Sequence, residues 1–135
     1  MAKIRIVTDS ASDMPYDYRK DVTVVPLHVR FGTEEYLDGV NLSHREFYEK
    51  LIENDELPTT SQVAPYAFEE AFDKAKQAGE QVIVITISGK LSGTYQSACI
   101  AAADYEDMVQ VIDSENVTVG ERALVEYAIR LMDNG

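Results

Sequence analysis

Short apolar runs alternate with longer amphipathic segments along this chain of 135 residues. The short runs are rich in Val and Ile and are bounded by polar residues, which is typical of β-strands. They cover residues 3–7 (KIRIV), 22–25 (VTVV), 27–31 (LHVRF), 81–87 (QVIVITI) and 108–112 (MVQVI). Two of the runs are almost continuously apolar, as expected for parallel strands that are buried on both faces.

A first helix is predicted from Ser43 to about Asn54. Ser43 is suited to cap the helix, Glu46 completes a capping box, and Leu42 is placed to pack on Phe47. Apolar residues at helical spacing indicate which side of this helix faces inward. The residues of that expected face are Phe47, Tyr48, Leu51 and Ile52.

Three further helices are predicted between the later apolar runs. Pro65 suits the first position of one helix and Gly79 its end, and Ser92 can cap another through about Ala103. A final helix is expected over residues 118–132. Inward-facing positions are expected at Phe68, Ala71, Phe72 and Ala75 in the first of these helices, and at Leu124, Tyr127, Ala128 and Leu131 in the last.

This alternation of strands and helices predicts an α/β fold, namely a three-layer α/β/α sandwich with a mostly parallel sheet and Rossmann-like topology. The length suits a single domain over residues 1–135. In open sheets of this kind, ligands bind beyond the carboxyl ends of the strands. The segments that leave the strands are therefore the expected place for a functional site.

Polar residues are concentrated in these segments. TDSASD (8–13), SGKLSGT (88–94) and DS (113–114) each follow a predicted strand, and TTSQ (59–62) precedes the helix that begins near Pro65. Ser, Thr and Asp are common helix caps, but one cap needs only one hydroxyl. Grouped hydroxyls and free N–H groups at a helix N-terminus form a pocket suited to a small anion.

The segments TDSASDMP, VVPLHV, YLDG, PTTSQ, ISGKLSGTYQSA and VIDS resemble, in order and spacing, the motifs of the DegV-like fatty-acid-binding proteins of bacteria. The resemblance implies a binding protein, not an enzyme, that presents the carboxylate of a long-chain fatty acid to a fatty acid kinase. The kinase makes an acyl phosphate for phospholipid synthesis. Family members continue into a second α/β domain that helps enclose the acyl chain, and that domain is expected to be absent from these 135 residues.

The same resemblance implies which side chains hold the ligand. Thr60 of the TSQ motif and Ser92 of the LSGT motif are expected to bind the fatty-acid carboxylate. Residues expected to support this site are Ser61, Gln62, Gly93, Thr94, Asp9 and Ser10.

An enzyme domain that binds a small metabolite or a nucleotide at the same edge is the alternative. The chain has no G-x-G-x-x-G after its first strand, and the residues around Lys90 lack the spacing of a P-loop. No segment matches the G-x-S-x-G motif of a nucleophile elbow. His28 and His44 stand where a structural or solvated role is favoured over a catalytic one.

Cation binding and thiol chemistry are not favoured. Asp9, Asp13 and Asp113 carry carboxylates of the kind that bind a divalent cation, but capping and loop-orienting roles are favoured for Asp9 and Asp13. We therefore expect no metal and no other cofactor. Cys99, the single cysteine, is expected to be buried by packing.

Charge and hydropathy narrow the choice of partners and compartment. The formal net charge is −12, from 24 acidic and 12 basic residues, and this charge repels nucleic acids. No segment approaches the about 20 apolar residues of a membrane span, no signal peptide is apparent, and a single cysteine suits a reducing compartment, so a cytoplasmic location is expected. Apolar surface that a second domain would cover is expected to drive formation of a homodimer.

Overall fold

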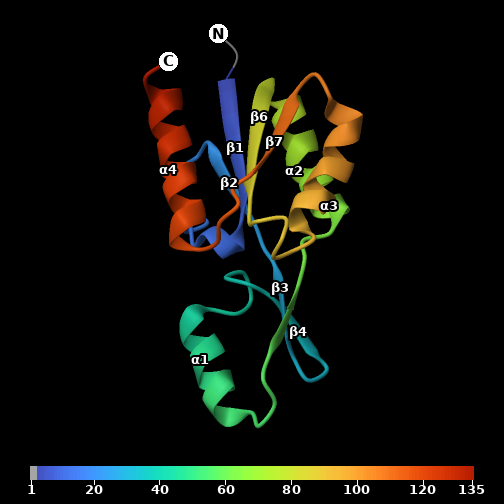
Figure 1. Ribbon diagram of the computed structural model, residues 1–135, viewed down its shortest axis with the longest axis vertical. Coiled ribbons are helices and arrows are strands. Elements are labelled where there is room, and N and C mark those ends of the chain that lie inside the picture. Colours follow the sequence, from blue (N-terminus) through green and yellow to red (C-terminus); the bar gives the residue numbers. More distant parts are fainter. Residues whose placement is uncertain (1–2) are drawn as a thin grey trace.

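Four parallel strands form the central sheet of the computed structural model, which describes residues 3–135. The strand order is β2–β1–β6–β7, and every neighbouring pair is parallel. These strands are β1 (Lys3–Asp9), β2 (Val22–Val25), β6 (Glu80–Thr86) and β7 (Val109–Asp113). The expected parallel sheet is confirmed, and the carboxyl ends of β1, β6 and β7 meet at one edge (Figure 1).

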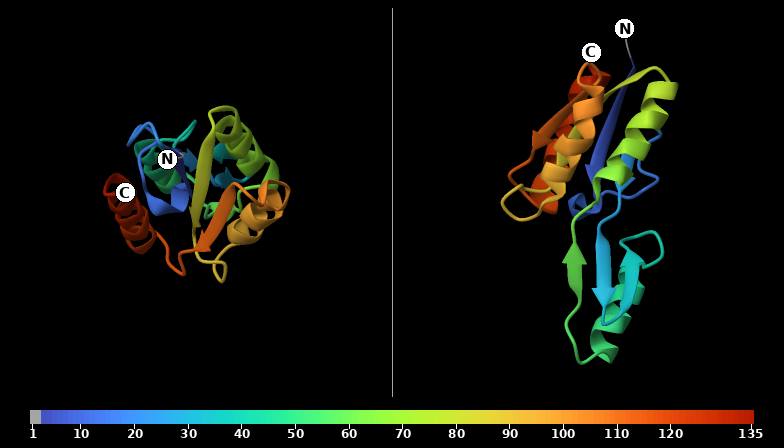
Figure 2. Two further views of the ribbon diagram at one scale, coloured as in Figure 1. Left: turned by 90° about the horizontal axis from the view of Figure 1, so that it is seen from above. Right: turned by 90° about the vertical axis from the view of Figure 1, so that its right-hand side faces the viewer.

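Helices cover both faces of this sheet, as the predicted three-layer sandwich requires (Figure 2, left). Helices α2 (Pro65–Gln77) and α3 (Thr94–Ala102) lie on one face, and α4 (Val119–Asp133) lies on the other. Two short 3-10 turns, η1 (Ser10–Ser12) and η2 (Ala103–Tyr105), follow β1 and α3. The inward positions expected for α2 are confirmed, because its buried residues are Phe68, Ala71, Phe72 and Ala75.

A smaller lobe projects beyond the carboxyl ends of the parallel strands (Figure 1). It contains helix α1 (His44–Glu53) and an antiparallel sheet of order β4–β3–β5. The strands of this sheet are β3 (His28–Phe31), β4 (Glu34–Leu37) and β5 (Thr59–Ser61). The sequence did not predict the lobe, because β4 and β5 are short and offer few apolar residues to a pattern-based prediction.

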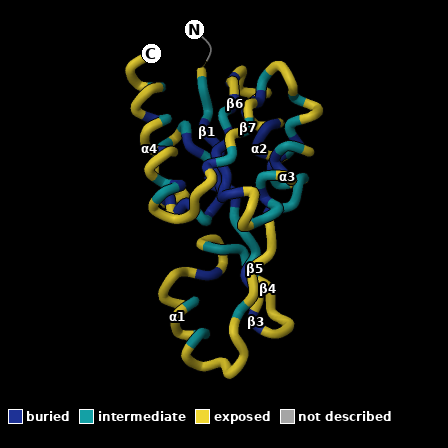
Figure 3. The backbone as a smooth tube through the Cα atoms, viewed as in Figure 1, coloured by how far each residue is buried: buried dark blue, intermediate teal, exposed yellow. Residues whose placement is uncertain are grey.

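Helix α1 forms as predicted, but fewer of its apolar side chains are buried than predicted. The Ser43–Glu46 capping box is present, and Phe47 packs with Leu42. The expected apolar face is wrong for two residues, since Tyr48 is 61% exposed and Ile52 is 85% exposed. The three-stranded sheet beneath α1 supports only a small apolar cluster, so most of the lobe is exposed to solvent (Figure 3).

The inward face predicted for α4 is wrong for three of its four residues, and only Ala128 packs against the core. Leu124, Tyr127 and Leu131 are exposed, and the buried residues of α4 are Glu121, Val125 and Ile129. These buried residues are spaced four apart and form one stripe against the sheet. A prediction from apolar periodicity assigns an acidic residue such as Glu121 to the outer face of the helix. The predicted buried stripe is therefore turned about the helix axis relative to the observed one.

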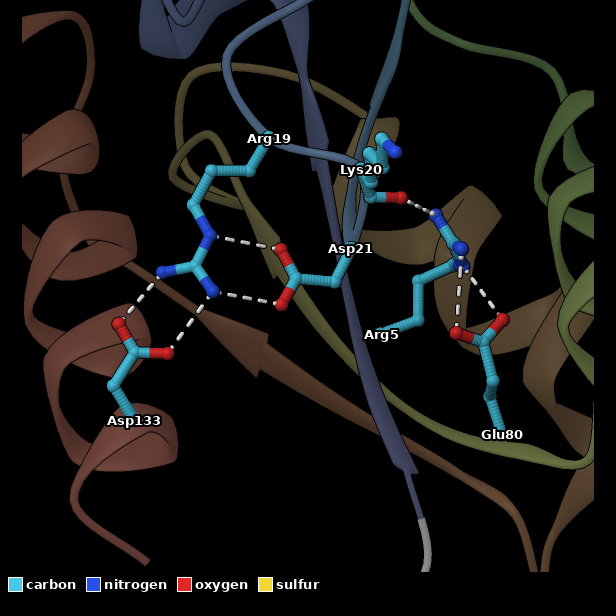
Figure 4. Close-up of polar contacts among 6 residues, drawn as sticks. All are labelled: Arg5, Arg19, Lys20, Asp21, Glu80 and Asp133. Atoms are coloured by element: carbon cyan, nitrogen blue, oxygen red, sulfur yellow. Dashed lines mark hydrogen bonds and ion pairs between the residues drawn. The ribbon is translucent and has the colours of Figure 1, made fainter.

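Ion pairs join the strands and α4 near the amino-terminal edge of the sheet (Figure 4). Arg5 of β1 lies 2.8 Å from Glu80 of β6, and Arg19 donates hydrogen bonds to both Asp21 and Asp133. These arginines are thus engaged by carboxylates far from the carboxyl edge. No helix among residues 3–135 is long and apolar enough to cross a bilayer.

Candidate functional site

A cavity of about 540 Å³ lies where the smaller lobe meets the carboxyl edge of the parallel sheet. The lobe contributes residues 60–62 of β5 and its exit, and the segment between β6 and α3 contributes residues 91–93. Leu27 and Ile87 complete the wall. The fold therefore brings the TTSQ and SGKLSGT segments, which are about 30 residues apart in the sequence, into one site.

Gly93 makes room for the Gln62 side chain where the segment after β5 approaches the start of α3. A Cβ atom at Gly93 would collide with the side chain of Gln62. The Gln62 amide in turn donates a hydrogen bond to the Ser97 hydroxyl of α3, with its Nε2 atom 3.2 Å from the Ser97 Oγ atom. Gly93 thus permits the contact that joins the lobe to α3.

Thr94 links the two segments that form the cavity, the one after β5 and the one before α3. Its side chain is fully buried, and its Oγ1 atom accepts a hydrogen bond from the Val63 backbone N–H at 3.2 Å. The same oxygen lies 2.9 Å from the Ser92 Oγ atom, which also accepts a hydrogen bond from the Thr94 backbone N–H at 3.2 Å. Helix α3 begins at Thr94 with Gly93 as its N-cap, one residue later than the predicted cap Ser92, although the Ser92 hydroxyl still accepts a hydrogen bond from the Thr94 N–H.

The side chains that line the cavity are all neutral. They carry hydroxyl and amide groups together with the apolar groups of Leu27, Ile87 and Leu91. The N-terminus of α3 adds a partial positive charge at this point. Because none of the lining side chains titrates near neutral pH, the site is suited to holding a polar head group rather than to transferring protons.

Asp9 and Ser10 lie behind the cavity and hold two of its walls. The Asp9 carboxylate accepts hydrogen bonds from the backbone N–H groups of Ile87, at 2.7 Å, and of Ala11, at 3.0 Å. The Ser10 hydroxyl accepts a hydrogen bond from the Leu27 N–H at 2.9 Å. Neither side chain lines the cavity, so both support it indirectly.

Glu121 of α4 is the buried polar residue that the sequence prediction missed. Its side chain is fully buried, accepts a hydrogen bond from the Thr8 hydroxyl at 3.1 Å, and lies near enough to the Asp9 carboxyl for the charge of Asp9 to act on it. Burial, followed by the nearby Asp9 charge, raises the pKa of Glu121 well above its ordinary value. The positive end of α4 opposes this shift by about 0.3–1 kcal/mol, whereas burial of an unpaired carboxylate costs several kcal/mol.

The pKa of Asp9 is raised as well, again mainly by burial. Its hydrogen bonds with the Ile87 and Ala11 N–H groups oppose that rise, because they stabilise the charged form. None of the groups that lower the pKa of Glu121 is a backbone N–H group. A signal for Glu121 does exist in the sequence, since it precedes Val125 and Ile129 by four and eight residues, which places it on their stripe.

The acidic residues considered for cation binding have structural roles in the loops. Asp113 accepts hydrogen bonds from the Gly89 and Glu115 N–H groups, and Asp9 is the N-cap of η1. Asp13 ends η1 in the left-handed conformation. Among residues 3–135, no group of three or more His, Cys, Asp or Glu side chains is arranged to hold a metal ion.

The remaining sequence candidates lie outside the cavity. His28 pairs with Glu35 across β3 and β4, and His44 is exposed in the first turn of α1. Cys99 is only half-buried, in contrast to the prediction. The buried side of α3 is formed by Thr94, Ser97, Ala98 and Ala101, so position 99 lies at its margin.

The parallel sheet, with a neutral cavity at its carboxyl edge, defines a Rossmann-like α/β domain. A model of the DegV family, described as uncharacterised proteins, matches residues 3–135. The chain therefore belongs to the DegV family. DegV domain-containing proteins of Clostridium perfringens and Clostridium acetobutylicum are 43% and 45% identical to it over 138 and 139 residues. The chain spans about half the length of these curated relatives, which cover all of it.

Solved structures of the family share this fold. A fatty-acid-binding DegV family protein from Thermus thermophilus superposes with a TM-score of 0.89 at 38% identity, covering 98% of this chain and 48% of its own. A stearic acid-binding protein from Eubacterium ventriosum gives a TM-score of 0.86 at 35% identity, with 100% and 48% coverage. The fatty acid binding protein DegV of Bacillus subtilis gives 0.89 at 31% identity, with 100% and 49% coverage.

Proposed function

We propose that this chain binds the carboxylate of a long-chain fatty acid and presents it to a fatty acid kinase for acyl phosphate formation. The observation that carries the proposal is the convergence of Thr60 and Ser92 on one neutral cavity. Structures similar to this chain are fatty-acid-binding proteins, which supports the same ligand class here.

The hydrogen bonds around Ser92 leave its hydroxyl hydrogen available to donate a hydrogen bond to a ligand. The Thr94 hydroxyl is buried and already accepts the Val63 N–H, so its own hydrogen is best placed to point toward the Ser92 oxygen 2.9 Å away. Ser92 then accepts two hydrogen bonds from Thr94 and can donate its hydrogen to a carboxylate. Thr60 supplies a second hydroxyl from β5 on the opposite wall.

The apolar residues of the cavity wall suit the first methylene groups of an acyl chain. These residues are Leu27, Ile87 and Leu91, and Leu91 is 65% exposed. Each methylene removed from water contributes about 0.8 kcal/mol, so tight binding of a long chain needs a larger apolar enclosure. We propose that the parts of a complete family member beyond these residues enclose most of the tail.

Presentation to a kinase fits a site that holds the carboxylate without modifying it. The lining side chains contain no titratable group that would activate a nucleophile, so the phosphoryl transfer belongs to the partner enzyme. A kinase that uses cellular ATP would act in the cytoplasm, and we propose the same location for this protein. The charge of −12 leaves nucleic acid an unfavourable partner.

Native mass spectrometry of the chain purified from bacteria tests the ligand class. Because the chain encloses little of the tail, a complex with a C16–C18 fatty acid is expected when the acid is added in excess, and its loss is expected in the Thr60→Ala/Ser92→Ala variant. Thr59→Ala is the matched control, because Thr59 is also an exposed threonine of β5 but does not line the cavity. Retention of the lipid by the double variant would refute the assigned residues, and a bound nucleotide would favour the small-metabolite enzyme instead.

A further inference from the structure

The Glu121 carboxyl group has two oxygens in different surroundings. The Oε2 atom accepts the hydrogen bond from Thr8, whereas the Oε1 atom is buried and, among residues 3–135, has no donor as a partner. A carboxylate oxygen left in this state loses its hydration without compensation, which is unfavourable. A proton on Glu121 removes this difficulty, because the carboxyl group can then donate a hydrogen bond.

The group that can accept this hydrogen bond is the Asp9 carboxylate, whose charge acts on Glu121. Asp9 receives two backbone N–H donors, from Ala11 and Ile87, whereas among residues 3–135 the one donor to Glu121 is the Thr8 hydroxyl. These donors favour the negative charge on Asp9 and the proton on Glu121. Two carboxyl groups that share one proton in this way carry a single charge.

The groups around the pair leave no other source of compensation. Helix α4 packs against β1, η1 and β6. The charged residues that act on Glu121 from these elements are Asp9 at the end of β1 and Asp13 after η1, and both are acidic. Arg122, the adjacent cation on α4, donates to the Asp13 carbonyl and pairs with Glu126.

We propose that Glu121 is a positioning residue of the cavity, a protonated acid that holds the Asp9 carboxylate against the Ile87 N–H group. The expected effect on ligand binding rests on the proposed fatty-acid function, whereas the proton on Glu121 does not. Glu121 itself does not line the cavity, so it acts on a ligand only through Asp9 and Ile87.

A series of contacts connects Glu121 to the cavity. Asp9 fixes the Ile87 N–H, Ile87 lines the cavity, and the next residue, Ser88, uses its carbonyl to accept the N–H groups of Leu91 and Ser92. Loss of the shared proton would set two carboxylates against each other with no cation between them. Asp9 would then shift and release the wall that carries Ile87.

Two substitutions separate the hydrogen bond from the charge. Glu121→Gln keeps a donor toward Asp9 at nearly the same volume, and Glu121→Met removes it. We expect palmitate affinity to stay within about twofold of wild type for Glu121→Gln and to fall about tenfold for Glu121→Met, as for the loss of one buried hydrogen bond. Glu126→Gln is the control, because Glu126 is an exposed acid on the same helix.

The protonation state is read directly by NMR. In the wild-type chain, the side-chain carboxyl carbon of Glu121 is expected to show the protonated chemical shift at pH 7, and the amide resonance of Ile87 is expected to move only in Glu121→Met. Titration of that carbon near pH 4.3, the value of an ordinary glutamate, would overturn the proposal. An Ile87 amide and a palmitate affinity unchanged in Glu121→Met would overturn the positioning role.

A failure of the Glu121 proposal can be distinguished from a failure of the proposed fatty-acid function. Should Glu121→Met fail to fold, the carboxyl spectrum of the wild type and the behaviour of Glu121→Gln still decide the matter. Should the wild-type chain bind no palmitate at all, the proposed function fails, while the spectra of Glu121 and Ile87 test the shared proton by themselves.

Discussion

The Ser92 and Thr94 hydroxyl oxygens lie 2.9 Å apart at the start of α3. This pair links the wall of the cavity to the backbone that follows β5, because Thr94 also accepts the Val63 N–H. One hydrogen-bonded unit thus orients the proposed ligand-binding hydroxyl and attaches the smaller lobe to the parallel sheet.

Removing the Thr94 hydroxyl should damage both roles. Thr94→Val keeps the shape of the side chain but leaves the Val63 N–H without its acceptor, at a cost of about 1–3 kcal/mol in the free energy of unfolding. Thr94→Ser keeps the hydroxyl and should retain most of the stability. Urea denaturation of both variants checks this, and equal stabilities for the two would contradict the role of the hydroxyl.

Removing the Ser92 hydroxyl should weaken ligand binding more than it weakens folding. If Ser92 donates to a carboxylate, Ser92→Ala lowers fatty-acid affinity by about 1.5–3 kcal/mol, as for hydrogen bonds to charged groups. Titration calorimetry on a chain that also carries the second domain expected from the family resemblance measures this. Ser43→Ala is a matched control, since it also removes a helix-capping hydroxyl but at α1, and it should affect stability alone. Unchanged affinity in Ser92→Ala would exclude the assigned role.

A side chain at position 93 should disturb the cavity through Gln62. Gly93→Ala places a Cβ atom against the Gln62 side chain, which must move and give up its hydrogen bond to Ser97. We expect a loss of about 1 kcal/mol in unfolding free energy together with weaker fatty-acid binding. In a Gln62→Ala background the clash is absent, so the same substitution should cost less. A double-mutant cycle measures the difference, and full additivity would show that Gln62 is not the cause.

Apolar periodicity predicted the parallel sheet and its helices because their inward residues follow regular spacing. It failed at β4 and β5, where short strands with polar residues form the lobe. The meeting of Thr60 with Ser92 followed from the family resemblance alone. Local patterns do not encode it, because the contact depends on an antiparallel edge strand that a three-residue segment forms only against β3.

Glu121 marks a different limit of prediction from sequence. Its spacing from Val125 and Ile129 places it on the buried stripe, but its usual charge argues for the outer face. The conflict is resolved only by Asp9, which lies 112 positions away in the numbered sequence and can accept its proton.

The exposed residues of α4 predict self-association of the 135-residue chain. Leu124, Tyr127 and Leu131 lie on one side of the helix and are 38%, 56% and 53% exposed. Sedimentation analysis is expected to show a dimer that strengthens with salt, because salt screens the repulsion between two chains of charge −12. Leu131→Lys should weaken the dimer, while Ile52→Lys on α1 should not. A strict monomer at high salt would contradict this prediction.

The free energy of unfolding should depend on pH through Glu121. Its pKa in the folded chain is raised above the value of about 4.5 expected in the unfolded chain. Above pH 4.5 the unfolded chain therefore releases a proton that the folded chain retains. Unfolding free energy should then fall as pH rises toward the folded pKa, by up to about 1.4 kcal/mol per pH unit.

Glu121→Gln removes this dependence, because its amide does not titrate. The stability of the variant relative to wild type should therefore increase from pH 4.5 to pH 7.5, whatever its value at the lower pH. Urea denaturation at several pH values measures the difference, with Glu126→Gln as an exposed control whose relative stability stays nearly constant. A parallel course for wild type and Glu121→Gln would show that Glu121 ionises in the folded chain as it does in the unfolded chain. The buried pair would then hold two negative charges, and the Asp9 carboxylate would have to keep the Ile87 wall in place without a proton from α4.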